Sequence, residues 1–452
     1  MAVLLASGLI AIGLSLRSGA QGARGGPTTA AGGGAHVDNP YVGADGYLNP
    51  DYVARVRSQA AADGNSSAEA RVAGYQTAIW MDHIGAITGD AGHRGLRRQL
   101  EAAVSRQGGR PELVEVVIYD LPGRDCAAGA SNGELPATRA GLSEYESRFI
   151  DPIASVLGNG RYRPLRIVTL IEPDSLPNAV TNRGLPPCAA AAPLYEQGIE
   201  YALDRLHAIP NVYTYLDVGQ SAWLGWPNNS RAAGEEYARV ARATRSGLAS
   251  VDGFVSNTSN YVPTQEPLLT NPTQAVGGRP LDSATFYQDN PTLDEYSYDQ
   301  QLYRTLVSNG FPSRIQFLID TSRNGWGGAD RPAHLDSGPA TPDAYAAANR
   351  IDRRPFRGDW CNQATAGIGA RPQAEPFGSS THIGAFVWVK PPGESDGDYP
   401  TESHPHGDTA CDPRGRNGGQ PTGSLPGADV PAGQWFPAEF QTLVRNAYPA
   451  LS

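Results

Sequence analysis

Acidic residues stand directly after several short apolar runs of this sequence, at the points where buried strands would end. Residues 114–118 form one such β-branched run, which stops at Tyr119 and continues into a Pro-Gly turn. Beyond the turn come Arg124 and Asp125, then a loop of small residues that leaves the Ser131 hydroxyl free to approach a ligand. A carboxyl group in such a place can exchange protons with a bound substrate. An ion pair between Arg124 and Asp125 would equally explain the two charges.

Four further apolar runs end in the same way. They are residues 166–171, followed by Glu172 and Asp174; 212–216, followed by Asp217; 315–319, followed by Asp320; and 384–389, followed by Lys390, Glu394 and Asp396. Parallel strands of a β/α barrel present catalytic groups at their carboxyl ends, whereas a β-sandwich gives no reason for this placement. The pattern therefore predicts an α/β barrel whose active site lies at that edge.

The residue types limit the kinds of reaction that this site could catalyse. No Ser-His pairing or Gly-x-Ser-x-Gly elbow is present, which argues against acyl transfer, and there is no phosphate-binding loop. The reaction that remains is hydrolysis of an acetal bond by two carboxyl groups. Tryptophans beside the strand ends would offer their ring faces to sugar rings. These tryptophans are Trp80, Trp223, Trp226 and Trp360. Core packing would explain any one of them alone, but Trp223 and Trp226 stand among loop residues, where burial is not the obvious need.

Helical stripes alternate with the apolar runs. Residues 75–82 are expected to form a first strand, after which Leu96, Leu100 and Val104 mark one face of an amphipathic helix. Later stripes follow at residues 142–156, 194–206, 298–306 and 440–444, with a polar helical piece near 343–350. Strands joined by crossover helices run parallel, which supports the barrel.

The composition indicates the broad class of protein. The 452 residues are 40% hydrophobic and 18% charged, enough to bury the core of one large barrel domain or of two ordinary domains, and we favour one. Counts of 53 Gly and 37 Pro suit many ordered loops rather than a helical bundle. A net charge of -10 without long Lys/Arg runs argues against a nucleic-acid partner.

The amino terminus is expected to be a secretory signal peptide over residues 1–20. Residues 1–14 are apolar but too short to span a bilayer, and small residues follow them. No Lys or Arg precedes Arg17, so the natural start would lie upstream; a membrane anchor is the alternative. Residues 21–38, rich in Gly, Ala and Thr, are expected to be a disordered leader before a folded domain over 39–452. The protein would then be secreted.

The four cysteines suit an exported, oxidised protein and allow three pairings. We expect neighbours to pair, Cys126 with Cys188 and Cys361 with Cys411, so that each bridge restrains a loop beside an acidic strand end. A metal site is not expected, because neither Cys-x-x-Cys spacing nor clustered His accompanies them.

Several of these stretches together resemble glycoside hydrolase family 6, the inverting cellulases. The similar stretches are, in order, residues 119–126 (YDLPGRDC), 171–176 (IEPDSL), 216–219 (LDVG), 223–226 (WLGW), 358–362 (GDWCN) and 387–396 (VWVKPPGESD). The resemblance is specific because several long motifs occur in the right order, and it runs from about Asn39 to the C-terminus. It implies a distorted, incomplete parallel β/α barrel, which the strand pattern alone does not distinguish from a complete one.

The resemblance implies a role for each carboxyl group of the motifs. Asp174 would be the general acid that protonates the glycosidic oxygen, and the proximity of Asp125 would raise the pKa of Asp174. Asp125 would also draw a proton from the attacking water, through a second water held by Ser131. Tyr119 would press on the distorted sugar ring at the point of cleavage.

Asp396 is the other candidate for the catalytic base. Lys390 and Arg124 are its candidate ion-pair partners, and with them it would serve mainly in electrostatics and sugar binding.

The resemblance also implies contacts along a glucan chain. The implied substrate-binding residues are Trp80, Asp82, Asp217, Trp223, Trp226, Asn257, Asn260, Trp360, Lys390 and Glu394, with the tryptophans as platforms. Many family members have His near the position of Gln220, so we expect a different sugar contact there without loss of activity. No cofactor or metal is implied.

Long insertions favour exo action within the family. They cover residues 261–294, 330–359 and 398–433, and loops of this length inside a compact domain are usually functional. Residues 324–328 and 351–354 resemble the bacterial exo-acting group. We therefore expect long active-site loops to form a tunnel, through which a monomeric cellobiohydrolase releases cellobiose from the non-reducing ends of cellulose and cello-oligosaccharides, without membrane or nucleic-acid partners. An endo-β-1,4-glucanase of the same family and a non-catalytic glycan-binding protein are the alternatives.

Overall fold

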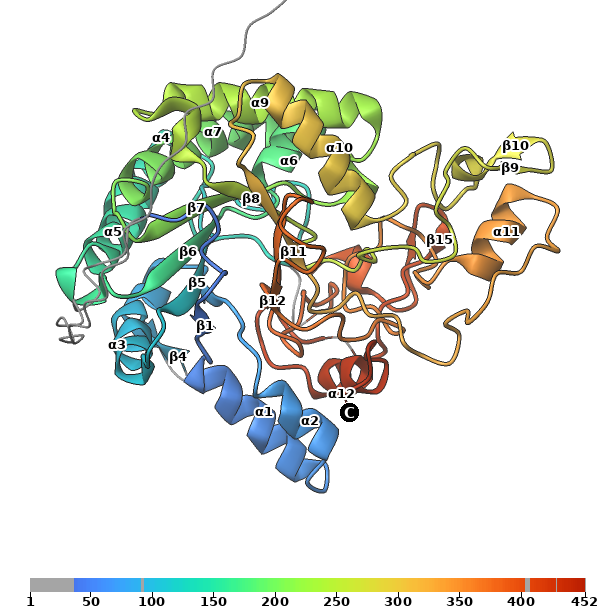
Figure 1. The fold of residues 1–452 in the computed structure, drawn as a ribbon, viewed down its shortest axis with the longest axis horizontal. Helices are drawn as coiled ribbons and strands as arrows, with labels where there is room; N and C mark the ends of the chain where they lie inside the picture. The colour runs from blue at the N-terminus through green and yellow to red at the C-terminus, as the bar shows by residue number, and fades with distance from the viewer. Residues whose placement is uncertain (1–35, 91–92, 403–406, 428, 452) are drawn as a thin grey trace, which may run out of the picture. The chain divides into compact units, whose positions relative to one another are not determined.

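A curled, mostly parallel sheet with helices on its outer face organises the residues that the computed structural model describes, which are 36–90, 93–402, 407–427 and 429–451 (Figure 1). The expected signal peptide at residues 1–20 and most of the expected leader at 21–38 lie outside these residues.

The main sheet has nine strands in the order β1-β5-β6-β7-β8-β11-β13-β12. The ninth, β2, pairs with the second half of β5, while β1 pairs with its first two residues. The strands are β1 (Asp45–Gly46), β2 (Ile79–Met81), β5 (Glu112–Ile118), β6 (Arg166–Ile171), β7 (Val212–Asp217), β8 (Gly253–Ser256), β11 (Gln316–Asp320), β12 (Gln373–Ala374) and β13 (Ile383–Val387). All of their pairings are parallel except that of β12 with β13. Five of these strands lie on the apolar runs that carry acidic residues at their ends.

The barrel stays incomplete between β2 and β13. No strand pairing joins them within the described residues, and the gap is crossed by single contacts instead. The backbone N–H of Ala78 donates to the Trp388 carbonyl at 3.1 Å, and the Trp80 indole N–H donates to the Val389 carbonyl at 2.9 Å. The expected distorted, incomplete parallel barrel is therefore confirmed, with one side left for a cleft.

Helices connect the parallel strands and cover the outside of the sheet (Figure 1). The helices are α1 (Pro50–Ala62), α2 (Ser67–Val72), α3 (Leu96–Arg106), α4 (Arg139–Glu144), α5 (Asp151–Leu157), α6 (Ser175–Thr181), α7 (Pro186–Leu206), α8 (Ser221–Leu224), α9 (Pro227–Ala243), α10 (Glu295–Ser308), α11 (Pro342–Asn349) and α12 (Pro437–Arg445). A π-helical turn at Tyr145–Ile150 joins α4 to α5, so the stripe at residues 142–156 is one bent unit. Each expected helical stripe lies on one of these helices.

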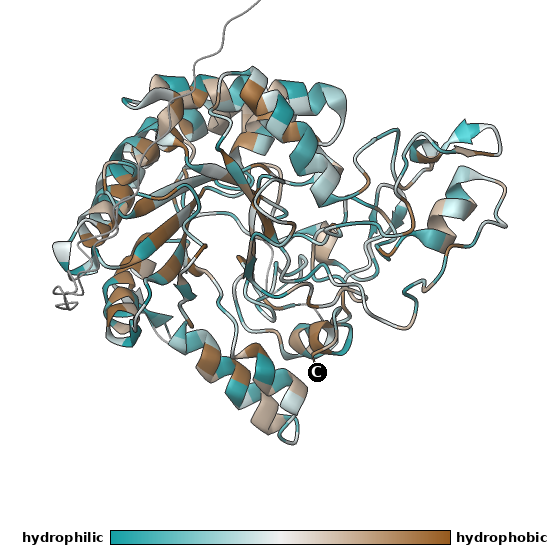
Figure 2. Ribbon diagram, in the orientation of Figure 1, coloured by the Kyte–Doolittle hydropathy of each residue, from teal (hydrophilic) through white to brown (hydrophobic). Residues whose placement is uncertain are grey.

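Alternation along β5 separates two apolar layers. Val114, Val116 and Ile118 point outward into the cluster formed with the helices, whereas Leu113 and Val117 belong to an inner cluster inside the barrel. Figure 2 shows the hydrophobic strands enclosed by helices whose outer faces are hydrophilic. Because both faces of the sheet are covered, the strands are mostly apolar, with buried exceptions such as Glu115, and most polar side chains stand at the strand ends.

The long insertions carry short elements of their own. Two-stranded ribbons are formed by β3 (Gly89–Asp90) with β4 (His93–Arg94), β9 (Ala275–Val276) with β10 (Arg279–Pro280), and β14 (Arg416–Asn417) with β15 (Gln420–Pro421). The ribbon of β9 and β10 lies with α11 away from the sheet, where a separate apolar cluster holds them together (Figure 1). None of the helices in the described ranges has the length and apolar character needed to cross a membrane.

Both expected disulfides are confirmed. Cys126 is bonded to Cys188 with a Cα–Cα distance of 4.9 Å, and Cys361 to Cys411 with 5.2 Å. The first ties the loop after β5 to α7, and the second ties the loop before Asn362 to the 398–433 insertion. Each bridge therefore restrains a loop beside an acidic strand end.

Candidate active site

The carboxyl ends of the strands open into a cavity of about 1440 Å³. The expected site residues that line it are Trp80, Asp82, Tyr119, Asp125, Ser131, Asp174, Trp223, Asn260, Trp360, Lys390, Glu394 and Asp396. The expected residues outside its lining are Asp217, Trp226 and Asn257. The structure thus brings together groups that follow β2, β5, β6, β8 and β13 in the chain.

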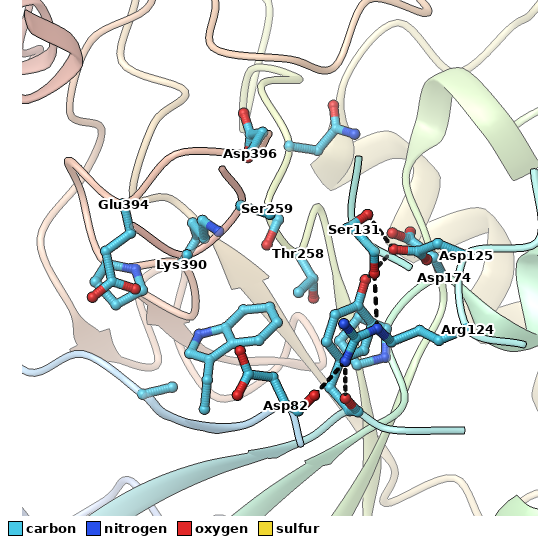
Figure 3. Close-up of a pocket in the computed structure, with 18 of the residues that line it drawn as sticks. Asp82, Arg124, Asp125, Ser131, Asp174, Thr258, Ser259, Lys390, Glu394 and Asp396 are labelled. Atoms are coloured by element: carbon cyan, nitrogen blue, oxygen red, sulfur yellow. Dashed lines mark hydrogen bonds between the residues drawn. The ribbon is translucent and has the colours of Figure 1, made fainter. Parts of the chain in front are cut away.

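Asp125 is held by two hydroxyl groups. The backbone of Asp125 is left-handed, with φ of 53°, which turns its side chain back toward the end of β5. Both Tyr119 and Ser131 donate hydrogen bonds to the same carboxylate oxygen, Oδ2 (Figure 3). Burial raises the pKa of Asp125, while Arg124 and the two hydroxyl groups act in the opposite direction. The arrangement presents a buried, oriented carboxylate with one oxygen occupied.

Arg124 braces the loop rather than neutralising Asp125. Its guanidinium donates to the carbonyls of Asp82, Tyr119 and Ser131, and lies 4.2 Å from the centre of the Tyr119 ring. The carboxylate nearest to it is Asp120, at 3.9 Å. An Arg124–Asp125 ion pair, one explanation of these charges in the sequence, is therefore not what the structure shows.

Asp174 is a half-buried carboxyl group among other carboxyl groups. It precedes α6 in a left-handed conformation with φ of 64°, and Glu172 before it is also left-handed, at 52°. Two such residues around one proline store backbone strain, as is common at functional sites. Within the described residues, no side chain or backbone group donates to the Asp174 carboxyl group. Burial, followed by the charges of Asp217, Asp125 and Asp396, raises the pKa of Asp174 well above its ordinary value.

Asp217 supports Asp174 from behind. Its Oδ2 accepts the backbone N–H of Asp174 at 2.9 Å and that of Gly219 at 3.0 Å, and burial raises its pKa to about 6. This places Asp217 as a holder of the strained turn and as a source of the field on Asp174, rather than as part of the cavity lining.

Asp396 is paired with an arginine that the sequence analysis did not single out. Arg323, which follows β11, contacts Asp396 Oδ1 at 2.8 Å, while Tyr261 O–H and Asn362 N–H donate to Oδ2 at 2.6 Å and 2.9 Å. The expectation that Lys390 or Arg124 pairs with Asp396 is wrong, because the Lys390 amine donates to the Ser395 carbonyl at 3.0 Å. The apolar run before Asp320 was the available signal for Arg323, three positions further along the chain.

A second carboxylate holds Arg323 from the other side. Glu439 on α12 lies 3.2 Å from the same guanidinium, and the side chains of Arg323 and Glu439 are almost fully buried. Three charged groups are therefore fixed in one buried network, which leaves Asp396 an immobile negative charge on the cavity wall.

Aromatic rings lie along the cavity. Trp80 meets the Tyr119 ring edge-on at 5.3 Å, and the Lys390 amine lies 5.4 Å from the centre of the Trp80 ring. Trp223 is half-buried with its indole N–H on Thr181 Oγ1 at 2.7 Å, so its orientation is fixed. Trp435, which the sequence analysis missed, also lines the cavity.

Trp226 and Asn257 do not line the cavity. The Trp226 indole donates to the Gln288 carbonyl at 2.9 Å, at the start of α9 and outside the cavity lining. Asn257 is fully buried, and its amide bonds to the backbone of Val262 and Asp320. It braces the loop that carries Asn260, whose Oδ1 faces Arg354 at 3.3 Å.

Charged and polar groups complete the wall. Asp82 accepts from His83 at 2.8 Å, and this contact raises the pKa of His83 to about 9. Burial raises the pKa of Glu394 to about 7, although Lys390 lies nearby. The Oε1 atom of Gln220, a residue of the cavity wall, is buried without a partner in the described part of the chain. In the same part of the chain, no group of three or more His, Cys, Asp or Glu side chains could hold a metal ion.

The chain is similar to known proteins over most of its length. Residues 41–447 match the family described as Glycosyl hydrolases family 6. Exoglucanase A of Cellulomonas fimi is 50% identical over 437 residues, which cover 94% of this chain and 50% of that protein. The chain thus spans about half the length of this curated relative.

The chain is also similar in structure to solved catalytic domains of this family. The catalytic domain of Cellulomonas fimi Cel6B has a TM-score of 0.89 at 49% identity, covering 92% of this chain and 96% of that one. Cellobiohydrolase II (Cel6A) from Humicola insolens, in complex with glucose and cellotetraose, has a TM-score of 0.72 at 30% identity, covering 91% and 99%. The chain therefore belongs to glycosyl hydrolases family 6, in agreement with the site that its strand ends assemble.

Proposed function

We propose that this chain is an inverting, exo-acting cellulase that hydrolyses β-1,4-glucosidic bonds and releases cellobiose from non-reducing chain ends. The observation that carries the proposal is Asp174, a half-buried carboxyl group that faces Asp125 and Asp396 across one cavity lined with tryptophans. Hydrolysis of an acetal requires one carboxyl group that is protonated and one that is not.

Asp174 is suited to be the proton donor. Its raised pKa favours the protonated form that a general acid needs, and no partner within the described residues competes for that proton. Asp217 contributes twice, because it holds the backbone of Asp174 and adds a negative charge that disfavours ionisation of Asp174. The proton would pass to the glycosidic oxygen as the bond breaks.

Asp125 is suited to receive the proton of the attacking water. Its Oδ2 is occupied by two hydroxyl groups, and Ser131 can hold a water molecule between this carboxylate and the anomeric carbon. Asp396 is less suited, because Arg323 and two further donors already satisfy it. Its fixed charge would instead stabilise the positive charge that develops on the sugar ring.

The cavity suits an oligosaccharide. Its volume of about 1440 Å³ exceeds the 300–1,000 Å³ common for drug-sized ligands, and it combines aromatic rings with amides and charges. Trp80, Trp223 and Trp360 would stack on successive sugar rings, while Lys390 and Glu394 would bind hydroxyl groups. Cellotetraose is the ligand named for the Humicola insolens structure.

Loops around the cavity support exo action. Phe356 and Gly358 of the 330–359 insertion and Asn417 of the 398–433 insertion line the cavity, whereas no described residue of the 261–294 insertion does. Two insertions that reach one cavity would enclose a chain end in a tunnel, and the Cellulomonas fimi relative is named an exoglucanase. Processive threading from an end then yields cellobiose.

We extend the proposal to the whole protein. A signal peptide at residues 1–20 and a leader at 21–38 would precede a catalytic domain at 39–452, and the enzyme would act as a secreted monomer on cellulose. The pair of disulfides suits an oxidising environment.

Product analysis tests the function. We expect cellobiose as the main early product from cellohexaose and amorphous cellulose, with little loss of viscosity of soluble substituted cellulose. Mixed longer products with a rapid fall in viscosity would replace the exo assignment by an endoglucanase. Binding without new reducing ends would make the chain a glycan-binding protein; the Asp174→Asn variant serves as the inactive control.

A further inference from the structure

A buried carboxyl group without a role stands beside the proposed catalytic residues. Asp120 follows Tyr119 at the end of β5 and is fully buried. Neither of its carboxyl oxygens has a hydrogen-bond partner among the described residues. Its nearest positive charge is the guanidinium of Arg124, at 3.9 Å. A buried polar group left unpaired in this way calls for an explanation.

The surroundings of Asp120 are mostly acidic. Glu172 lies beneath it and accepts the backbone N–H groups of Asp120 at 3.2 Å and Leu121 at 3.4 Å. The titratable and charged groups that face Asp120 are Asp82, His83, Arg124, Glu134, Tyr145 and Glu172. Burial raises the pKa of Asp120 to about 8, and burial likewise raises the pKa of Glu172 to about 8. Both groups are therefore neutral at pH 7.

Arg124 connects Asp120 to the catalytic carboxylate. Figure 3 shows Arg124 joined by hydrogen bonds to Asp82 and to the loop of Ser131. Its guanidinium also donates to the Tyr119 carbonyl. The bond to the Asp82 carbonyl is 2.6 Å, and that to the Ser131 carbonyl is 2.9 Å. Tyr119 and Ser131 are the two residues whose hydroxyl groups orient Asp125. One guanidinium thus fixes both donors.

An ionised Asp120 would compete for that guanidinium. A carboxylate binds guanidinium more strongly than a neutral carbonyl does, especially out of water. At 3.9 Å the two groups are just beyond hydrogen-bond distance, so a small displacement of Arg124 would close the contact. The same displacement would lengthen the bonds to the Tyr119 and Ser131 carbonyls.

We propose that Asp120 is a positioning residue that acts through Arg124: when neutral it leaves Arg124 on the carbonyls that orient Asp125, and when ionised it draws Arg124 away from them. The inference rests on the proposed function, because it assigns the water-attack step to Asp125. It adds a second group to that step, behind the cavity wall and out of contact with the substrate.

Ionisation of Asp120 at high pH should slow the attack of water. Below pH 8, Asp120 carries its proton and Arg124 holds Tyr119 and Ser131. As the pH rises through about 8, Asp120 ionises and the orientation of Asp125 is lost, so water attack slows. Loss of the proton from Asp174 also lowers the rate at high pH, so the test must remove the need for a general acid.

The test measures kcat against pH on a dinitrophenyl cellotrioside, whose leaving group departs without protonation. For the wild type, kcat should fall by about tenfold for each pH unit above the midpoint. Asp120→Asn, normalised to its own plateau, should keep its rate over the same interval, and KM should not follow the change. Asp120→Ser, which is also neutral, gives the same measurement if Asp120→Asn does not fold.

Glu115→Gln is the matched control. Glu115 is buried on β5, the strand that leads to Asp120, burial raises its pKa to about 8 as well, and its hydrogen bond goes to Tyr41 rather than to Arg124. Its pH profile should coincide with that of the wild type. Coincident normalised profiles for the wild type and Asp120→Asn would overturn the inference alone. A wild type that hydrolyses neither this substrate nor cello-oligosaccharides would overturn the proposed function with it.

Discussion

Asp174 and Asp125 are the same amino acid in two different electrostatic settings. Asp174 faces three other carboxylates and receives no hydrogen bond from the described residues, so its neutral form is favoured. Burial raises the pKa of Asp125 as well, but two hydroxyl hydrogen bonds and the charge of Arg124 act in the opposite direction and favour its charged form. Opposite surroundings within one cavity therefore separate the proton donor from the proton acceptor.

Replacing Asp174 by Asn should expose its role as the acid. Turnover of cello-oligosaccharides should fall by about 10²–10⁴-fold, the usual contribution of general acid catalysis. The loss should be much smaller on a dinitrophenyl cellotrioside, because that leaving group needs no proton. Steady-state kinetics of the variant on both substrates would check this. Equal losses on the two would assign Asp174 a structural role instead.

The carboxyl groups could be predicted from the sequence because they directly follow strands, and strands are readable from local apolar runs. Arg323 and Trp435 could not, since their contacts with Asp396 and with the cavity depend on how distant loops pack. The direction of side chains at strand ends is equally hard to predict. Asn257 has a φ of 61°, and this left-handed turn sends its amide into the protein rather than into the cavity.

At the scale of elements, β5 leads directly to residues of the proposed active site. It also contains a buried carboxyl group, Glu115, whose burial lowers the stability of the fold. It pairs with β1, β2 and β6, and its end carries Tyr119 and Asp120. The β-branched run at residues 114–118 predicted this strand correctly. The sequence did not show that β2 would remain three residues long and unpaired with β13, because that depends on the geometry of the closing sheet.

Glu115 in the middle of β5 offers a test of that cost. Burial raises its pKa from 4.5 to about 8, so the folded state binds a proton that the unfolded state has released between those pH values. The stability of the wild type should therefore fall as the pH rises from about 4.5 to about 8, by a few kcal/mol at most. Glu115→Gln should lack the share of this fall that is due to Glu115, while other buried carboxyl groups keep theirs.

Chemical denaturation at pH 5 and at pH 8 would measure the effect. The free energy of unfolding of Glu115→Gln relative to the wild type should be clearly higher at pH 8 than at pH 5. The Tyr41 hydroxyl, which donates to Glu115 at 2.9 Å, can donate to a glutamine oxygen as well, so this contact is retained. A difference that is the same at both pH values would contradict the raised pKa.

At the scale of the whole molecule, two disulfides hold loops that the sheet does not order. They close loops of 62 and 50 residues, and each ends beside a functional segment. Cys126 follows Asp125 directly, and Cys361 follows Trp360. The bridges could be predicted as pairs of neighbouring cysteines beside acidic strand ends, whereas the tunnel proposed around the cavity depends on how long insertions fold together.

Removing each bridge should therefore affect a different kinetic constant. The double variant Cys361→Ala/Cys411→Ala should mainly raise KM for cello-oligosaccharides, because it releases the loop of Trp360. Cys126→Ala/Cys188→Ala should mainly lower kcat, because it releases the loop of Asp125. Each should reduce the free energy of unfolding by about 2–4 kcal/mol. Thermal unfolding and steady-state kinetics would show this, and two identical kinetic effects would contradict the assignment of the loops.

The central claim is that a water molecule, activated at Asp125, attacks the sugar directly while Asp174 protonates the leaving oxygen. The most direct measurement is NMR of the wild type acting on cellohexaose, following the anomeric protons of the new reducing ends before mutarotation. Direct attack inverts the configuration, so the α-anomer should appear first. Early appearance of the β-anomer would mean a covalent intermediate and would contradict the roles assigned to both carboxyl groups.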